Sequence, residues 1–248
     1  MKILLINDFK NGGGAEVVFL QTYKTLKEMG LEVDLLYCHD KITPPTSVIS
    51  YLFSNRNYRK LYKRLTQKRY DLVYILNYAY AFSPSILLAV KKYKKQNHNV
   101  KVIYNAHDAH IICPNSVFAF FKKKQMHLFP SAPRVREFIF KRLDYRGVIH
   151  SVLKKIQWLL AYRLFKLYNV FDEILCPSIF LCSKIQETYP KAKVSLLRNP
   201  LELDNIAKLR IYNKNISNAI KIVYFGRISQ EKGLKELIEN LKDIDYNY

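Results

Sequence analysis

The first 37 residues of the chain contain two apolar segments separated by a glycine-rich turn and an amphipathic segment. The run Ile3–Ile6 is followed by Gly12-Gly13-Gly14, then by a predicted helix over residues 15–29 that ends at Gly30, and then by a second predicted strand over 32–37. Two strands joined through a helix form a βαβ unit, and the strands of such a unit are parallel. The sequence therefore predicts an α/β fold with a doubly wound parallel sheet.

The turn at residues 11–16 is the first candidate for a binding site. Glycines allow a close approach of the backbone, and the helix that follows presents free N–H groups and the positive end of its dipole. Phosphate and carboxylate groups are the ligands that such a helix start favours. The spacing Gly12-Gly13-Gly14 differs from the GxGxxG pattern of dinucleotide sites, so a tight turn without a ligand is an equal alternative.

The βα rhythm continues after an expected loop at 41–50 and is interrupted once. Further strands are predicted at 71–76, 100–105, 173–178, 194–197 and 220–225, and further helices at 55–69, 84–97, 180–188 and from 234. Between them, residues 115–170 combine many cations with interleaved aromatic residues, and we expect this region to be helical. Its segment 148–168 is apolar nearly all round, so that either both sides are buried or one side meets lipid.

The net charge of the chain indicates which kinds of partner it can bind. The chain carries 41 Lys and Arg against 20 Asp and Glu, a net charge of +21, which suits nucleic acid, an anionic membrane or phosphorylated substrates. Its four cysteines lack the spacing of a metal site and the density of a disulfide scaffold, which indicates a reducing cytosol. The sequence shows no signal peptide and no run of about 20 uncharged apolar residues that would span a membrane.

Several motifs, taken in order, resemble glycosyltransferase family 4, whose members have the GT-B fold. They are GGGAE after the first strand, HDAHIICP after the strand at 100–105, PSIF and RNP in the middle, and IVYFGRISQEKGLKELIE near the end. The resemblance implies two Rossmann-like domains that face each other across a cleft. It also implies an acceptor on the N-terminal side, a nucleotide sugar on the C-terminal side, and transfer that retains the anomeric configuration without a metal or other cofactor.

The resemblance assigns roles to particular residues. Arg227 and Lys232 match the basic pair on the donor diphosphate, where their charge would stabilise the leaving group. Gly13 and Gly14 match the glycine turn near the donor phosphates, and Glu16 matches the acidic residue that follows. His107 matches a histidine that faces the transferred sugar and is the predicted catalytic residue; a core or capping histidine is the alternative.

The resemblance also implies a domain plan. We expect an N-terminal acceptor-side domain over 1–200, a linker over 201–218, and over 219–248 only the first βα unit of a Rossmann-like donor domain. The family's E-x7-E motif, which holds the donor sugar, belongs to a later part of that domain; Glu231, Glu236 and Glu239 are assigned to the first helix of the unit and are not that motif. The alternatives are a truncated enzyme, a split enzyme whose other half is a separate chain, a fragment of a longer protein, and an inactive remnant. We expect residues 219–248 to be loosely docked on the N-terminal domain or to depend on a partner chain.

The predicted function is transfer of a sugar from a nucleotide sugar to a lipid-linked or cell-surface polysaccharide acceptor. We expect a cytoplasmic protein, peripheral on the inner face of the cell membrane, with no nucleic-acid partner. The predicted contact surface is Phe120 and Phe121 with Lys122, Lys123 and Lys124, because cations attract anionic lipid and aromatic rings insert at its interface. The alternative is a basic nucleic-acid-binding protein whose aromatic residues stack on bases.

Overall fold

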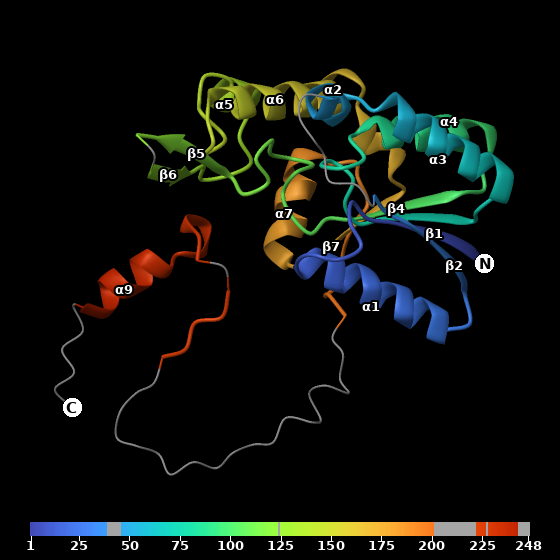
Figure 1. Cartoon of the computed structure of the whole chain (residues 1–248), viewed down its shortest axis with the longest axis horizontal. Coiled ribbons are helices and arrows are strands. Elements are labelled where there is room, and N and C mark those ends of the chain that lie inside the picture. The colour runs from blue at the N-terminus through green and yellow to red at the C-terminus, as the bar shows by residue number, and fades with distance from the viewer. Residues whose placement is uncertain (39–45, 124, 201–221, 227, 243–248) are drawn as a thin grey trace, which may run out of the picture.

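The computed structural model describes residues 1–38, 46–123, 125–200, 222–226 and 228–242 (Figure 1). A six-stranded sheet lies at its centre, and every strand pair in it is parallel. The sheet order is β2-β1-β3-β4-β7-β8, so the predicted α/β fold with a doubly wound, Rossmann-like parallel sheet is confirmed. The strands are β1 Lys2–Ile6, β2 Glu32–Leu36, β3 Leu72–Ile75, β4 Lys101–Asn105, β7 Glu173–Cys176 and β8 Val194–Leu196.

Strand β1 explains why the first segment is uniformly apolar. Its side chains alternate between two cores: Leu4 and Ile6 face one, and Ile3 and Leu5 face the other. Helix α1 (Gly14–Glu28) covers the second core through Val18 and Phe19, while α3 (Asn55–Lys68) and α4 (Ser85–Gln96) cover the first. A stretch of strand buried on both faces must be apolar at every position, as residues 3–6 of β1 are.

Serine side chains cap the N-termini of two helices, and both helices begin within one residue of the predicted positions. The Ser54 hydroxyl accepts the N–H of Asn57 at the start of α3, and the Ser178 hydroxyl accepts the N–H of Leu181 at the start of α7 (Ile179–Thr188). Each hydroxyl satisfies one of the N–H groups that a helix start leaves unpaired. The helix predicted at 180–188 is thereby confirmed to within one residue.

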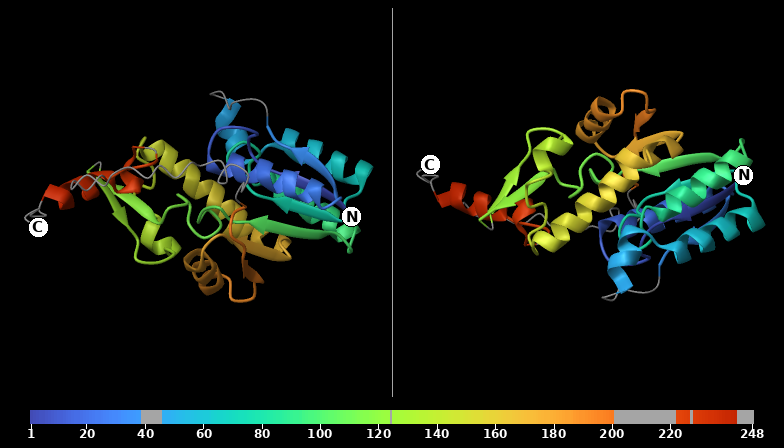
Figure 2. Two further views of the ribbon diagram at one scale, coloured as in Figure 1. Left: turned by 90° about the horizontal axis from the view of Figure 1, so that it is seen from below. Right: turned by 90° about the horizontal axis from the view of Figure 1, so that it is seen from above.

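Two segments differ from the sequence-based expectation. Part of the expected loop at 41–50 is helix α2 (Thr46–Leu52), and the expected helical region 115–170 contains a two-stranded antiparallel hairpin, β5 (Ala119–Lys122) and β6 (Gln125–Leu128). The hairpin is a separate sheet and lies apart from the main one in each view (Figure 2). A short helix, α5 (Val135–Phe138), follows it.

The single helix predicted over 148–168 is also divided. It is α6 (Val148–Trp158), then a π-helical stretch (Leu159–Leu164), then a 3-10 turn (Leu167–Val170) after Lys166, whose φ of 48° ends the helix. The wider π turn keeps both Trp158 and Tyr162 in the core, where each is almost completely buried. Packing of aromatic rings thus overrides the regular period that the sequence indicated.

The C-terminal part is described only in pieces. The predicted linker 201–218 lies outside the described residues, and residues 222–225 of the predicted strand form no strand. A 3-10 turn (Gln230–Lys232) leads into helix α9 (Leu234–Lys242), which confirms the helix predicted from 234 and buries none of its side chains. Within the described ranges, no helix is long and apolar enough to cross a membrane.

Candidate functional site

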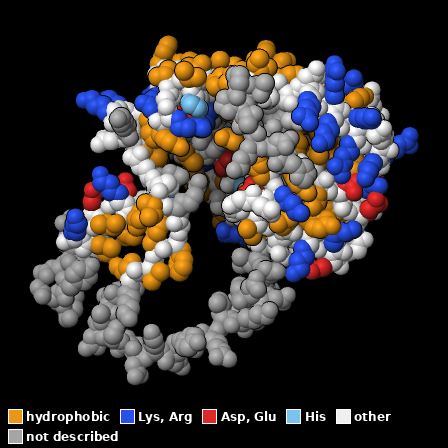
Figure 3. Space-filling model, viewed as in Figure 1, with side chains coloured by type: hydrophobic (Ala, Val, Ile, Leu, Met, Phe, Trp, Pro, Cys, Tyr) orange, Lys and Arg blue, Asp and Glu red, His pale blue; other side chains and the backbone are white. Residues whose placement is uncertain are grey.

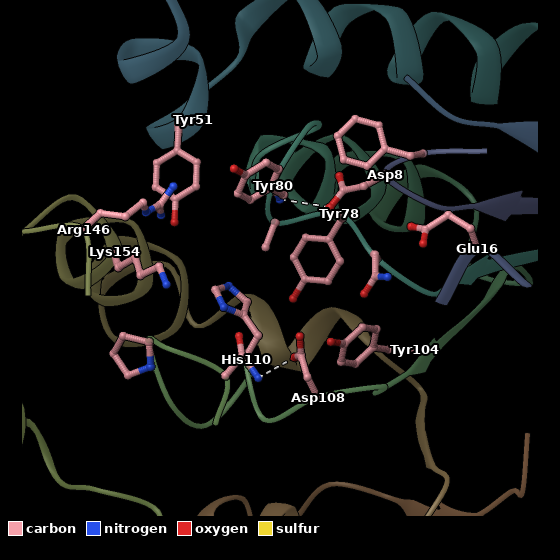
Figure 4. A pocket seen from close by; sticks show the side chains of 15 residues that line it. Asp8, Glu16, Tyr51, Tyr78, Tyr80, Tyr104, Asp108, His110, Arg146 and Lys154 are labelled. Carbon is pink, nitrogen blue, oxygen red and sulfur yellow. Dashed lines mark hydrogen bonds between the residues drawn. The ribbon is translucent and has the colours of Figure 1, made fainter. Parts of the chain in front are cut away.

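The sheet order creates a crevice at one place. The chain passes from β2 on one side of β1 to β3 on the other, so the loops after β1 and β3 leave in opposite directions at the carboxyl edge. Open α/β sheets bind their ligands at such a switch point. A cavity of about 290 Å³ lies here (Figure 4). The labelled residues in its lining are Asp8, Glu16, Tyr51, Tyr78, Tyr80, Tyr104, Asp108, His110, Arg146 and Lys154.

Asp8 follows β1 and fixes the loop after β3. Its Oδ1 accepts the backbone N–H groups of Ala81 and Phe82 at 2.9 and 3.1 Å, and its Oδ2 accepts that of Tyr80 at 3.0 Å. Burial raises the pKa of Asp8 to about 6, although the three N–H groups act in the opposite direction. Asp8 therefore positions the aromatic residues of this loop at the cavity.

Glu16 holds the glycine turn closed on α1. Its Oε2 accepts the N–H of Gly13 at 2.7 Å, and its Oε1 accepts the side-chain amide of Asn7 at 3.4 Å. A Cβ at Gly13 would stand 3.3 Å from Oε2, whereas one at Gly14 would meet nothing within 4 Å. Open space next to the backbone of the turn is thus found at Gly14, where α1 begins.

Two histidines follow β4, and both are neutral at pH 7. Burial lowers the pKa of His107 to about 4 against the opposing charge of Glu16, and burial together with Lys154 lowers the pKa of His110 to about 4. Among the described residues, neither Nε2 atom has a hydrogen-bond partner. His110 lines the cavity and is 8% exposed, and its backbone N–H donates to Asp108.

The cavity wall opposite Asp8 and Glu16 is basic, and its two cations are both paired with one buried carboxylate. Asp144, 2% exposed, accepts two hydrogen bonds from the Arg146 guanidinium at 2.9 Å each, and the Lys154 ammonium lies 2.9 Å from its Oδ2. These contacts hold the pKa of Asp144 well below its usual range despite burial. Two cations on one carboxylate leave one net positive charge at this side of the cavity, which Figure 4 shows facing Asp8 and Glu16.

Tyrosines cover the floor and rim. Tyr78 and Tyr104 are buried, stand edge to face with ring centroids 5.5 Å apart, and have pKa values raised by burial. The Tyr78 hydroxyl is hydrogen-bonded to that of Tyr162. Tyr80 is exposed at the rim, with its ring 6.3 Å from that of Tyr51. Carboxylates, cations and aromatic rings around a modest cavity can bind a hydroxyl-rich ligand by stacking and polar contacts.

The structure brings together only part of the predicted site. Glu16 lines the cavity, and Gly13 and Gly14 lie in the glycine turn where α1 begins. His107 lies at the same edge of the sheet, close enough for the Glu16 charge to affect its pKa, but it is not in the lining. Lys232 ends the 3-10 turn before α9 with an exposed side chain, and Arg227 lies outside the described residues.

The predicted membrane-contact residues lie on the hairpin, where aromatic packing limits their exposure. The Phe120 ring stacks on His127 and lies beneath the Lys141 ammonium, 3.8 Å from its centroid, and Phe121 meets Tyr145. Lys122 and Lys123 are exposed, and Lys124 lies outside the described residues. Phe120 and Phe121 are therefore half-buried, and a membrane contact through the hairpin stays a prediction.

Sequence reasoning missed much of the lining. Asp8 and Asn77 follow the ends of neighbouring parallel strands, and that pattern could have identified them. Arg146 and Lys154 come from a segment with no βα rhythm, so no sequence pattern indicated that they line the cavity. No group of three or more potential metal ligands occurs in the described ranges.

Comparison with solved structures found matches of low sequence identity. An alpha-glucosyltransferase solved with UDP and a 13-mer DNA is 16% identical, over 83% of this chain and 44% of that one, with a TM-score of 0.46. A UDP-GlcNAc 2-epimerase from Methanocaldococcus jannaschii is 11% identical, over 80% and 46%, with a TM-score of 0.40. The chain thus spans less than half the length of these proteins. Comparison with the curated proteins gave no match.

The family comparison is more specific. The model of Glycosyltransferase Family 4 matches residues 12–205, which is well over half of the chain and includes the three glycines of the turn and strand β3 of the crevice, while β1 lies just before the matched range. The resemblance read from the motifs is thereby confirmed. The chain belongs to glycosyltransferase family 4.

Proposed function

We propose that the protein takes part in transferring a sugar, with retention of configuration, from a nucleotide sugar to a lipid-linked or cell-surface polysaccharide acceptor, and that the acceptor binds in the cavity at the β1/β3 switch point. The observation that carries this proposal is the lining itself, where Tyr51 and Tyr80 stand beside charged groups fixed by their own hydrogen bonds. A sugar ring presents apolar C–H faces to aromatic rings and hydroxyls to charged groups, so this combination suits a glycan.

The donor side of the proposal depends on the glycine turn and the C-terminal segment. Gly13 and Gly14 would admit the donor phosphates to the N-terminus of α1, while Arg227 and Lys232 would neutralise charge on the leaving diphosphate. These cations make a metal unnecessary in the proposed reaction. His107, neutral at pH 7 and at the same edge of the sheet, would face the transferred sugar as a hydrogen-bonding group.

The proposal includes a partner and a location. A separate chain would supply the rest of the donor half, which is the second domain of the family's two-domain plan. We place the protein in the cytoplasm, peripheral on the inner face of the cell membrane, where lipid-linked acceptors and an anionic surface occur together.

A measurement of acceptor binding to this chain tests the proposal, because it does not require the donor-binding half. Saturation-transfer NMR with a panel of oligosaccharides and short lipid-linked glycans should detect binding to the chain. Tyr80→Ala should weaken that binding about tenfold, since one stacked ring is worth on the order of 1 kcal/mol beyond its buried area. Tyr145→Ala is the control, because Tyr145 is also an exposed tyrosine, at 72% against 51% for Tyr80, and lies outside the lining.

Two results would overturn this assignment. If no member of the panel binds, the cavity is not an acceptor site. If the Tyr80 and Tyr145 variants lose affinity equally, the glycan binds elsewhere. Short single-stranded DNA serves as the competing ligand, and its displacement of the glycan from the Tyr80 surface would favour the nucleic-acid alternative.

A further inference from the structure

Helix α6 exposes an aliphatic stripe. Val148, Val152 and Ile156 recur every fourth residue, Ile149 lies beside them, and all four are exposed, Ile149 by 74%. We call these four residues the α6 stripe. Figure 3 shows hydrophobic side chains in a band along the upper edge of the molecule, over the region of α5, α6 and α2. An apolar surface of this kind on a basic protein indicates a contact with a partner.

The buried residues of α6 include three with polar side chains. The Ser151 hydroxyl accepts the N–H groups of Leu143 and Asp144, the Lys155 ammonium donates to the carbonyl of Ile139 at 2.7 Å, and the Gln157 amide donates to the carbonyl of Ala79. These bonds fix the rotation of the helix about its axis. The stripe therefore stays outward, since turning it inward would break every one of them.

The surroundings of the stripe are cationic. Residues 134–170 contain nine Lys and Arg against two acids, Glu137 and Asp144. Asp144 is buried and paired with two cations, and Glu137 accepts the N–H of Arg134 at the start of α5. Next to α6, α2 adds the exposed Ile49 and leads into α3, whose outward residues include Arg56, Arg59 and Lys60.

We propose that the α6 stripe, with Ile49 of α2, docks into the surface of an anionic lipid bilayer. Aliphatic side chains on a short helix enter the interface between headgroups and acyl chains, and the surrounding cations bind anionic headgroups. A second copy of the chain fits less well, because it would bring the same excess of positive charge to the contact. This surface is distinct from that of the hairpin residues Phe120 and Phe121, whose contact with a membrane is a separate prediction.

The position of the cavity agrees with this orientation. Lys154 lines the cavity from the same helix that carries the stripe, so about one helix diameter, roughly 10 Å, separates the stripe from the cavity wall. A bilayer on the stripe would bring the cavity to the level of the lipid headgroups. The inference rests on the peripheral location in the proposed function, but not on the transfer chemistry.

The test is sedimentation of the full chain with vesicles of phosphatidylglycerol and phosphatidylcholine, at low and at moderate salt. Ile149→Asp should lower the partition coefficient at least tenfold. Ile179→Asp on α7 is the matched control, because it makes the same substitution at a position that is 68% exposed, and it should change the coefficient less than twofold. Pure phosphatidylcholine vesicles should bind the protein at least tenfold more weakly than the anionic ones.

Three outcomes would overturn the inference. Equal losses in the two variants would show that added negative charge, not the stripe, decides binding. Binding that moderate salt abolishes completely would show that no side chain inserts. A concentration-dependent dimer that Ile149→Asp dissociates, without vesicle binding, would identify a second copy as the partner. Glycan binding in the NMR assay is read separately, so a failure of the proposed acceptor site leaves the vesicle result intact.

Discussion

Replacing Asp8 with Asn should change how the stability of the protein depends on pH. Asp8 is 4% exposed, and burial raises its pKa from 3.8 to about 6, with the hydrogen bonds from Tyr80, Ala81 and Phe82 acting against this rise. The folded chain therefore binds a proton at a pH where the unfolded chain has released it. Asparagine has no proton to bind, so the variant lacks this contribution.

The magnitude follows from the two pKa values. Between pH 3.8 and pH 6 the folded state holds one more proton than the unfolded state, so the free energy of unfolding falls as pH rises, by about 1.36 kcal/mol per pH unit. Over roughly two units this amounts to about 3 kcal/mol. The contribution is complete below pH 3.8 and is lost as pH rises through 6. As the pH is lowered, the free energy of unfolding of the wild type should therefore rise relative to that of the Asp8→Asn variant.

Urea unfolding at several pH values from 4 to 7 measures the difference. Trp158 is the chain's single tryptophan and is buried, so its fluorescence reports the transition. His107 and His110 titrate in both proteins, and their effect cancels in the difference. A difference between wild type and variant that stays constant within about 0.5 kcal/mol over this range would refute the reasoning.

Two further predictions concern the turn and the basic wall. Gly14→Ala should raise the free energy of unfolding by about 0.5–1 kcal/mol, since Gly14 is helical and its Cβ meets nothing, while Gly13→Ala should not, because its Cβ stands 3.3 Å from Glu16. If donor phosphates approach the turn as proposed, Gly14→Ala should also weaken UDP binding in calorimetry; unchanged binding would count against a phosphate site here. Asp144→Asn should lower the free energy of unfolding by about 2–3 kcal/mol in urea, because it leaves Arg146 and Lys154 unpaired. The exposed pair of Glu187 and Lys184 provides the control, and Glu187→Gln should cost less than about 1 kcal/mol; equal losses would disprove the special role of Asp144.

The sheet could be predicted because its strands are buried on both faces. Such strands need an apolar residue at every position, as in Ile3–Ile6, and this requirement is local to the strand. The glycine turn, the two serine caps and the helices between the strands are likewise set by neighbouring residues. The family motifs lie in these regular parts, which is why their order identified the family.

The hairpin was not predicted because its signal competes with the charge pattern. The segment around Phe120 and Phe121 shows no clear alternation of polar and apolar residues, and it was included in the basic, aromatic region 115–170 that was expected to be helical. The pairing of Ala119 with Leu128 and of Phe121 with Met126 joins residues across a turn, and the ring of Phe120 then packs on Phe129. Such contacts between separate segments outweigh local preference.

The amino-acid sequence by itself determined the parallel sheet, the turn at Gly13 and Gly14, and membership of the family, because each depends on residues close together in the chain. Only the tertiary structure decided which face of α6 is buried. That helix is apolar on nearly every side, so its pattern points in no single direction. Carbonyl groups of Ile139 and Ala79 bind its Lys155 and Gln157, which turns the α6 stripe outward and Lys154 toward the cavity.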